Sequence, residues 1–263
     1  MAATTTCEIC GGSGWRVIER DGISAAARCS CQQVVRAGAA LLAAQIPPLY
    51  ENASIDNFLL PANNPIAENA MGKVLLDVRA FIRNFPATDK PGLLFIGDPG
   101  VGKTHLAVAV LRALLERGFD GLFFDYQNLL ERIRSSYDPM AGSSDREAYR
   151  SVLEAEVLLL DDLGAHRVSD WVEDTVTSIV TWRCNHRKPT LVTTNLADAD
   201  AGSTVVQKSD TGRMEYRDTL GQRIGSRARS RLFEMCRVIK MPQVDDYRIR
   251  GSRSSGSLFG KGA

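Results

Sequence analysis

The most specific chemical signal in the sequence is the glycine-rich run Gly97-Asp-Pro-Gly-Val-Gly-Lys103-Thr104. It fits the phosphate-binding pattern G-x-x-x-x-G-K-[ST] at every defined position, with an apolar run before it and a helical pattern after it. Glycines here let backbone N–H groups wrap phosphates, and the start of the helix adds a partial positive charge. We therefore predict that Lys103 reaches the β- and γ-phosphates of ATP and that Thr104 holds Mg²⁺. The residues expected to line the nucleotide are Gly97, Asp98, Pro99, Gly100, Val101, Gly102, Lys103, Thr104 and the adjacent His105.

Polar side chains also end two later apolar runs. Asp161 and Asp162 follow Val157-Leu-Leu-Leu160, and Asn195 follows the run that begins at Thr190. Carboxylates at the C-terminal edge of a parallel sheet lie where ligands collect. We expect Asp161 to bind Mg²⁺ through water and Asp162 to orient or deprotonate the attacking water. Asn195 is predicted to contact that water or the γ-phosphate.

Four of the six cysteines crowd into the N-terminal segment, at Cys7, Cys10, Cys29 and Cys31. Two close pairs separated by a short loop suit a tetrahedral Zn²⁺ site, because each pair clamps the ion from one turn. The glycines after Cys10 let the chain bend so that backbone amides face the sulfurs. Disulfides are the alternative, but we find no export signal that would favour them. Cys184 and Cys236 are expected to pack in the core.

Short apolar runs alternate with helical patterns in the chain after Pro91. Unbroken apolar strands that alternate with helices predict a parallel sheet covered on both faces. The predicted strands are 93–96, 122–125, 157–160, 190–194 and 237–240. The predicted helices are 32–45, 66–85 and 105–117, and 220–233 is a further candidate.

The composition excludes a disordered, collagen-like or membrane-spanning chain. Of the 263 residues, 44% are hydrophobic and 24% are charged, and no apolar run approaches the roughly 20 residues that cross a bilayer. We expect a cytoplasmic protein with no membrane partner. From residue 205 onward there are thirteen Lys and Arg against six Asp and Glu. This excess fits either a phosphate-bearing partner or a solvated basic surface.

These motifs, together with a late cluster of arginines, resemble AAA+ ATPases. Specifically, they look like the DnaC/DnaI-type helicase loaders and the related IstB-type transposition helper ATPases. The run Ile46-Pro-Pro-Leu-Tyr50 and the later run Ile55-Asp-Asn-Phe58 are similar to theirs, and the resemblance covers roughly residues 45 to 250. It implies an α/β fold with a five-stranded parallel sheet in the order 5-1-4-3-2, flanked by helices, with a reduced or absent lid. The implied division is a zinc-binding, partner-binding segment at 1–45, a linker at 46–65, the ATPase domain at 66–250 and a flexible tail at 251–263.

The resemblance also implies roles for residues outside the phosphate loop. Tyr50, in the linker 46–65 that we call the approach segment, would border the adenine. Arg231, in the step Ser-Arg-Leu, would enter the nucleotide site of the next subunit, with Arg227 as its rival, and Arg248, in a Tyr-Arg step, would read the phosphates as "sensor 2". Arg223, Arg227 and Arg231 share one face if 220–233 forms a single helix. Asp162 is shorter than the glutamate of most AAA+ proteins, so we expect slow intrinsic hydrolysis.

The function implied is an ATPase that loads the replicative DNA helicase onto single-stranded DNA and self-associates through its nucleotide site. The zinc-bearing segment would grip the helicase. The stretch 130–134 lies where related loaders contact single-stranded DNA, so Tyr126, Arg132 and Arg134 would contact DNA or form an exposed helix face. Three alternatives stay open: an IstB-like helper of a DNA transposase, a nucleotide-gated scaffold with little turnover, and a zinc-dependent DNA-binding module.

Overall fold

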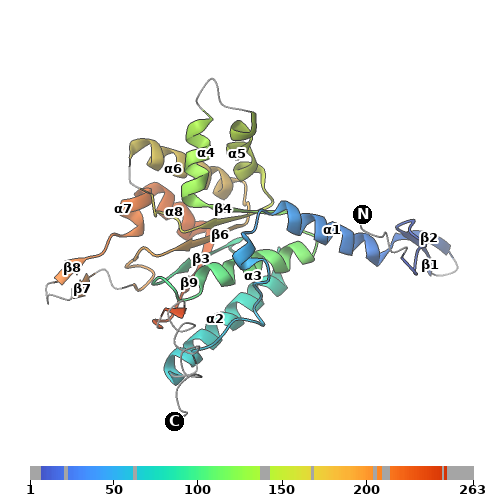
Figure 1. Ribbon diagram of the computed structural model, residues 1–263, viewed down its shortest axis with the longest axis horizontal. Coiled ribbons are helices and arrows are strands. Elements are labelled where there is room, and N and C mark those ends of the chain that lie inside the picture. The colour runs from blue at the N-terminus through green and yellow to red at the C-terminus, as the bar shows by residue number, and fades with distance from the viewer. Residues whose placement is uncertain are drawn as a thin grey trace, which may run out of the picture.

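A parallel five-stranded sheet organises the computed structural model, which describes residues 7–20, 23–61, 64–136, 143–166, 169–203, 206–208, 214–244 and 246–247 (Figure 1). The strands are β3 (Gly92–Ile96), β4 (Gly121–Asp125), β5 (Val157–Asp161), β6 (Thr190–Thr194) and β9 (Cys236–Lys240). They lie in the order β4-β5-β6-β3-β9, and every neighbouring pair is parallel. This confirms the predicted order 5-1-4-3-2 and puts β6 between the phosphate-loop strand and the strand with the two acids.

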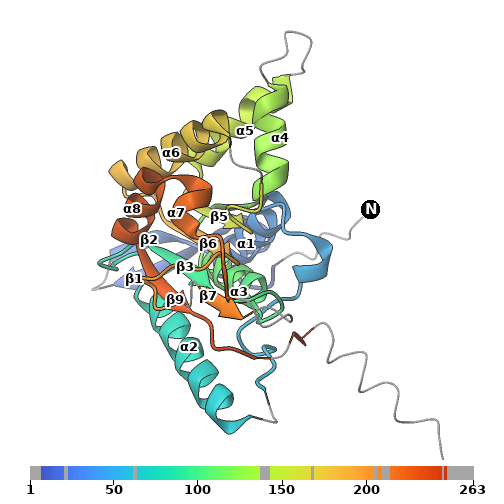
Figure 2. The same ribbon diagram turned by 90° about the vertical axis from the view of Figure 1, so that its left-hand side faces the viewer.

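Alternate strand residues point to opposite faces of the sheet, and helices cover both faces (Figures 1 and 2). Leu93, Phe95 and Leu159 pack with α2 (Pro65–Asn84), α3 (Lys103–Glu116) and the end of α1 (Ser30–Ala43). On the other face, Leu94 and Val192 pack with α6 (Asp170–Asn185), α7 (Leu220–Ile224) and α8 (Ser226–Met235). The helices α4 (Tyr126–Ser135) and α5 (Ser143–Glu154) cover the β4 end of that face. The sheet is therefore buried from both sides, which explains its unbroken apolar strands.

The N-terminal segment forms an antiparallel hairpin followed by a helix. The hairpin pairs β1 (Trp15–Arg20) with β2 (Ile23–Arg28), and α1 runs from it towards the sheet. Figure 1 shows the hairpin at the far end of α1, away from the other strands. At the near end, Ala40 and Ala44 are buried in the core, and the Phe123 amide donates to the Ala44 carbonyl at 2.8 Å. Helix α1 thus links the cysteines directly to the edge strand β4.

The stretch between β6 and α8 corrects one prediction. A second hairpin, of β7 (Val206–Lys208) and β8 (Met214–Tyr216), precedes α7, and the expected helix over 220–233 is two helices. Gly225 breaks it at φ +84° and ψ 150°, a backbone conformation that residues other than glycine rarely adopt. A side chain at this position would also clash with Glu173, because a Cβ there would lie 2.3 Å from its carboxylate. Arg223 therefore lies on a different helix from Arg227 and Arg231.

After β9 the described chain turns back along the phosphate loop. The amide of Met241 donates to the Ile96 carbonyl at 2.8 Å, and the amide of Tyr247 donates to the Gly100 carbonyl at 3.1 Å. Arg248 and the tail 251–263 lie outside the described residues. Among the residues that are described, no helix is long and apolar enough to cross a membrane.

Candidate nucleotide-binding and hydrolysis site

The glycine-rich loop joins β3 to α3, which begins at Lys103. Gly102 has φ +92°, and a Cβ there would lie 2.5 Å from the ring of Phe58, so both backbone and space require glycine. The first N–H groups of α3 have no partner within the helix, which makes the loop a favourable place for an anion. The residues predicted to wrap phosphates are therefore held at the N-terminus of a buried helix.

A cleft of about 530 Å³ opens over this loop at the C-terminal edge of the sheet. Its lining combines the loop with side chains from the ends of β4, β5 and β6. The residues around it are Leu49, Tyr50, Pro99, Gly100, Gly102, Lys103, Thr104, His105, Asp125, Asp161, Asp162, Thr193, Asn195 and Tyr247. Most of the predicted site residues thus surround one volume, although they come from distant parts of the chain.

A chain of hydrogen bonds joins the lysine of the loop to the second acid. The Nζ of Lys103 donates to Oδ1 of Asn195 at 2.5 Å and to the carbonyl of Asp98 at 2.7 Å. The amide nitrogen of Asn195 donates to Oδ1 of Asp162 at 2.6 Å. Asn195 therefore touches both the cation and the acid, where a γ-phosphate and its attacking water would be recognised.

Thr193 connects the two acids. Its hydroxyl donates to Oδ1 of Asp161 at 2.6 Å and accepts from the backbone N–H of Asp162 at 2.9 Å. Asp162 has φ +55°, a left-handed conformation that costs energy for a residue with a side chain but is better tolerated by Asp than by most. The hydroxyl therefore fixes the relative position of the two carboxylates in this turn.

Asp161 has the environment of a ligand for a hard cation. Burial raises the pKa of its carboxyl, and hydrogen bonds from Thr193 and Thr104 act in the opposite direction. Asp125, at the end of β4, adds a further carboxylate close enough to raise the pKa of Asp161. Carboxylate and hydroxyl oxygens are the donors that Mg²⁺ prefers, so the predicted ligands Thr104 and Asp161 fit this ion chemically.

An apolar pocket adjoins the cleft on the side of the approach segment. Phe58, Met71, Val244 and Tyr247 line it together with Gly100 and Gly102 of the loop. The His105 ring meets that of Phe58 edge-on at 5.5 Å and hydrogen-bonds the Ser54 carbonyl at 2.9 Å. His105 is therefore held by the approach segment while it lines the cleft.

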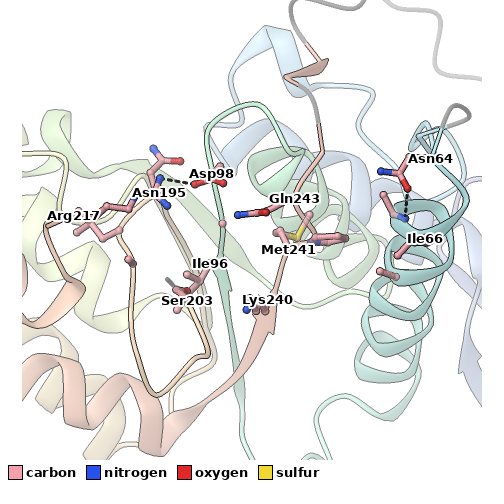
Figure 3. Close-up of a pocket in the computed structure, with 16 residues that line it drawn as sticks. Asn64, Ile66, Ile96, Asp98, Asn195, Ser203, Arg217, Lys240, Met241 and Gln243 are labelled. Carbon is pink, nitrogen blue, oxygen red and sulfur yellow. Dashed lines mark hydrogen bonds and ion pairs between the residues drawn. The ribbon is translucent and has the colours of Figure 1, made fainter. Parts of the chain in front are cut away.

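On the opposite side of the loop an ion pair lies in a second cavity of about 530 Å³ (Figure 3). Nη2 of Arg217, directly after β8, lies 2.6 Å from Oδ1 of Asp98. Lys240, at the end of β9, lines the same cavity and donates to the Gly202 carbonyl. Asp98 thus turns its carboxylate away from the cleft, and the loop is tied to the β7–β8 segment.

The late arginines differ in their partners. Arg231 is bound at 2.6 Å to Glu234 on its own helix, and Arg223 pairs with Asp218. Arg227, in the first turn of α8, is exposed and makes no ion pair to the described part of the chain. Arg227 and Arg231 line one shallow groove between α6 and α8, among Ser and Thr side chains.

One aromatic residue does not lie where the sequence suggested. Tyr126 is only 2% exposed and packs between the sheet and the helices of the α8 face. Burial raises the pKa of its hydroxyl, as expected for a phenol cut off from water. Both expectations for Tyr126, a contact with DNA and a place on an exposed helix face, are therefore wrong. The guanidinium of Arg134 packs on the ring of Trp171, with 4.8 Å from its central carbon to the ring centre.

The four N-terminal cysteines form one cluster, with all four sulfur atoms within 4.8 Å of one another. The sulfurs of Cys7 and Cys29 are 3.8 Å apart, and those of Cys10 and Cys31 are 3.5 Å apart. A Zn²⁺ ion bound at about 2.3 Å by four thiolates separates the sulfurs by roughly 3.8 Å, so the cluster fits tetrahedral zinc. The Gly14 amide donates to the Cys10 sulfur at 3.3 Å, and this bond, together with hydrogen bonds from Cys31, Gly12 and Cys7, lowers the pKa of the Cys10 thiol to about 6. The predicted contact between a backbone amide and a cysteine sulfur is thus confirmed.

Comparison with known families decides where the chain belongs. The model of the family described as IstB-like ATP binding protein matches residues 76–214. The chain belongs to this IstB-like family. It is 27% identical over 150 residues to the replicative helicase loader DnaC of Escherichia coli (strain K12), covering 57% of this chain and 58% of DnaC. The chain thus spans less than two thirds of the curated relatives that it matches.

Solved structures agree with this assignment. The crystal structure of the DnaC helicase loader shares 33% identity and a TM-score of 0.58, covering 74% of this chain and 100% of that one. The AMPPCP-bound DnaA of Aquifex aeolicus has a TM-score of 0.52 at 16% identity, covering 82% of this chain and 58% of DnaA, and supports the fold alone. This member of the IstB-like family is therefore an AAA+ ATPase of the DnaC/IstB type, as the sequence predicted.

Several residues around the site of this IstB-like ATPase were missed from the sequence. Asp125 carries a usable signal, since it ends an apolar strand just as Asp161 does. The hydroxyl of Thr193 is hidden in an ordinary strand, and the Asp98–Arg217 pair spans 119 residues of sequence. The N-terminal hairpin had a clear signal, because Asp21-Gly22 between two short runs is typical of a two-residue turn.

Proposed function

We propose that this IstB-like ATPase loads a replicative DNA helicase onto single-stranded DNA, with ATP bound between neighbouring copies. The observation that carries the proposal is the Lys103–Asn195–Asp162 chain beside Asp161, on a fold shared with the DnaC helicase loader at 33% identity. The first is machinery for nucleotide hydrolysis, and the second points to the task that hydrolysis serves. The match covers only 58% of the DnaC relative, so the helicase is proposed as the partner and is not carried over from that relative as a finding.

In the proposed reaction, each polar residue of the cleft has one task. Lys103 leaves Asn195 and contacts the β- and γ-phosphates, and Asn195 then holds the γ-phosphate against the attacking water. Asp162 accepts a proton from that water while the water oxygen forms a bond to the γ-phosphorus. The bond between the γ-phosphorus and the bridging oxygen of the β-phosphate breaks, and ADP leaves. Thr104 and Asp161 would hold Mg²⁺, which would supply positive charge to the phosphates. The adenine lies between Tyr50 and the pocket of Phe58, Val244 and Tyr247.

An arginine from a neighbouring copy completes the site and makes hydrolysis depend on self-association. Arg227 is the better candidate for this trans arginine than Arg231, because Arg231 is held in an ion pair with Glu234 whereas Arg227 is exposed and makes no ion pair to the described residues. A guanidinium neutralises charge that develops on the transferred phosphoryl group, an effect worth about 10³–10⁵-fold in related enzymes. Arg248 is the proposed sensor 2 of the same site.

The N-terminal segment is the proposed helicase-binding region. The cysteine cluster, closed by four thiolates with no open position, would hold a structural Zn²⁺. Exposed apolar side chains continue from the hairpin, at Trp15 and Val17, onto α1, at Val34, Val35 and Leu42. Apolar surface of this kind is typical of a protein-binding site. DNA would be contacted elsewhere, along the exposed side of α4.

Co-elution on a sizing column tests the proposal. The purified protein is mixed with the replicative helicase of its own organism, with and without ATP, and the Lys103→Ala variant serves as the matched control. A shared high-mass peak that responds to ATP in the wild type but not in Lys103→Ala is expected. Separate peaks under both conditions would overturn the loader function.

A second candidate function follows from the family match itself, because the matched model describes IstB-like proteins. The same ATPase would then assist a DNA transposase on duplex DNA. The two functions differ in their partner, so a transposase encoded beside this protein replaces the helicase in the same column experiment. ATP-dependent binding to duplex rather than single-stranded DNA would favour this second function.

A further inference from the structure

A partly buried ion pair joins the loop after β6 to helix α8. Asp198, three residues beyond Asn195, is 2% exposed. Its two carboxylate oxygens accept from Nε and Nη2 of Arg229 at 2.6 and 2.7 Å, a bidentate geometry. Burial alone would raise the pKa of Asp198, but the bonds from Arg229 hold it below its usual range. The carboxylate is therefore a charged, oriented anchor, and bidentate pairs of this kind fix direction as well as distance.

Arg229 occupies the middle of α8, between Arg227 and Arg231. Its guanidinium packs on the ring of Phe233 at 4.5 Å, which fixes the side chain from the helix side. Because residues two apart on a helix point in different directions, Arg229 faces inward to Asp198 while Arg227 is exposed. The contact with the loop after β6, together with the buried Ala228, Leu232 and Met235 of α8, therefore fixes the rotation of this helix and so the direction of Arg227.

The path from Asn195 to Asp198 is short and held along its length. The Thr194 hydroxyl donates to the Leu163 carbonyl at 2.8 Å and accepts from the Leu196 amide at 3.1 Å. The Leu220 amide donates to the Ala197 carbonyl at 3.0 Å, which ties the start of α7 to the same loop. Little slack chain therefore separates Asn195 from Asp198.

We propose that Asp198 and Arg229 are positioning residues that couple the state of a chain's own nucleotide site to the arginine it presents to the next chain. This rests on the proposed trans arginine. When Lys103 leaves Asn195 for the phosphates and Asn195 turns to the γ-phosphate, the ion pair carries the shift of Asn195 to α8 and aligns Arg227. Neighbouring sites then hydrolyse in a linked order instead of independently.

The competing role is a simple brace that keeps α8 folded, and the test separates the two. The acceptor is the Arg227→Ala chain, whose own site is intact but which cannot complete a neighbour's site. The donor is the Asp162→Asn chain, which binds ATP without hydrolysing it and supplies Arg227. A second donor, Lys103→Ala, supplies the arginine from a site that cannot hold ATP. ATP hydrolysis by a limiting amount of acceptor is measured with an excess of each donor.

We expect the ATP-holding donor to stimulate the acceptor at least about tenfold more than the empty donor, since displacements of about 1 Å can cost about 10²-fold in rate. Adding Arg229→Lys or Asp198→Asn to the Asp162→Asn donor should abolish this difference. Asp200→Asn is the matched control, because Asp200 also pairs with Arg229 but is exposed. That donor should behave as the unmodified one.

Two results contradict the inference in different ways. If donors with Arg229→Lys still stimulate only when they hold ATP, the ion pair is a brace and the coupling is wrong, while the trans arginine survives. If no donor stimulates the acceptor at all, the trans arginine itself is wrong. The unfolding midpoint and the ATP affinity of the Arg229→Lys donor are measured as controls for folding. If the Asp198→Asn donor does not fold, the Arg229→Lys donor still provides the test, because its lysine keeps one N–H contact to Asp198.

Discussion

The nucleotide cleft and the cysteine cluster are both small groups of polar atoms, but they are assembled from different distances along the chain. Lys103, Asp162 and Asn195 come from three segments, and the sheet brings them within hydrogen-bond reach. The four cysteines lie within 25 residues and need only one hairpin between them. The cleft therefore depends on the whole fold, whereas the cluster depends on the local chain and on the Zn²⁺ that we propose it binds.

Zinc removal should produce the largest effect, and it acts on the cysteine cluster. Structural Zn²⁺ sites contribute about 10–16 kcal/mol of binding free energy in small domains, so removing Zn²⁺ with a chelator that spares Mg²⁺ should unfold residues 7–31. Hydrogen exchange is expected to show loss of protection in β1 and β2 but not in β3 or β6. ATP affinity measured on the same sample should stay within about twofold, as expected for unlinked sites. Loss of ATP binding on chelation would show that the two regions are one cooperative unit.

The substitution Asp162→Asn acts on the nucleotide cleft instead. The amide keeps a contact with Asn195 but cannot accept a proton, so kcat should fall by about 10²–10⁴-fold while ATP affinity is retained. Steady-state hydrolysis at a high protein concentration, together with a nucleotide-binding titration, checks this. Zinc content should equal that of the wild type. Equal losses of affinity and kcat would instead assign Asp162 to nucleotide binding.

What the sequence could predict follows the same division between local and distant contacts. The phosphate loop and the cysteine pairs are local patterns whose spacing carries their chemistry, and the order of the sheet came from the resemblance that the motifs established. The Asp98–Arg217 pair and the Asp198–Arg229 pair join separate segments, and no local pattern marks them. The break at Gly225 could have been predicted from the sequence, because a glycine inside a helical pattern costs about 1 kcal/mol of helix stability and commonly marks the end of a helix.

Arg183 tests how far the cleft depends on distant packing. It is fully buried, and its guanidinium donates to the carbonyls of Val152, Leu153 and Ala155 at the end of α5 and to that of Pro189 before β6. Arg183→Met leaves these carbonyls without their donor, so the free energy of unfolding should fall by about 3 kcal/mol. Denaturant titration measures this, with the exposed Arg187→Met as control. Hydrogen exchange in the cysteine hairpin should not change, and increased exchange there would contradict local folding of that segment.

Leu42 provides the smallest stability effect and the sharpest separation of binding from folding. Its side chain is 88% exposed on α1, only two residues before the buried Ala44. Leu42→Ser should leave the free energy of unfolding within about 0.5 kcal/mol, because no packed contact is removed. Helicase co-elution should nevertheless weaken, since an apolar side chain that contributes little to the fold is free to contribute to an interface. Ala44→Ser is the matched control, because it should cost stability by placing a hydroxyl in the core while leaving the exposed surface of α1 unchanged. If Leu42→Ser binds the helicase as the wild type does, the contact lies elsewhere on the N-terminal segment.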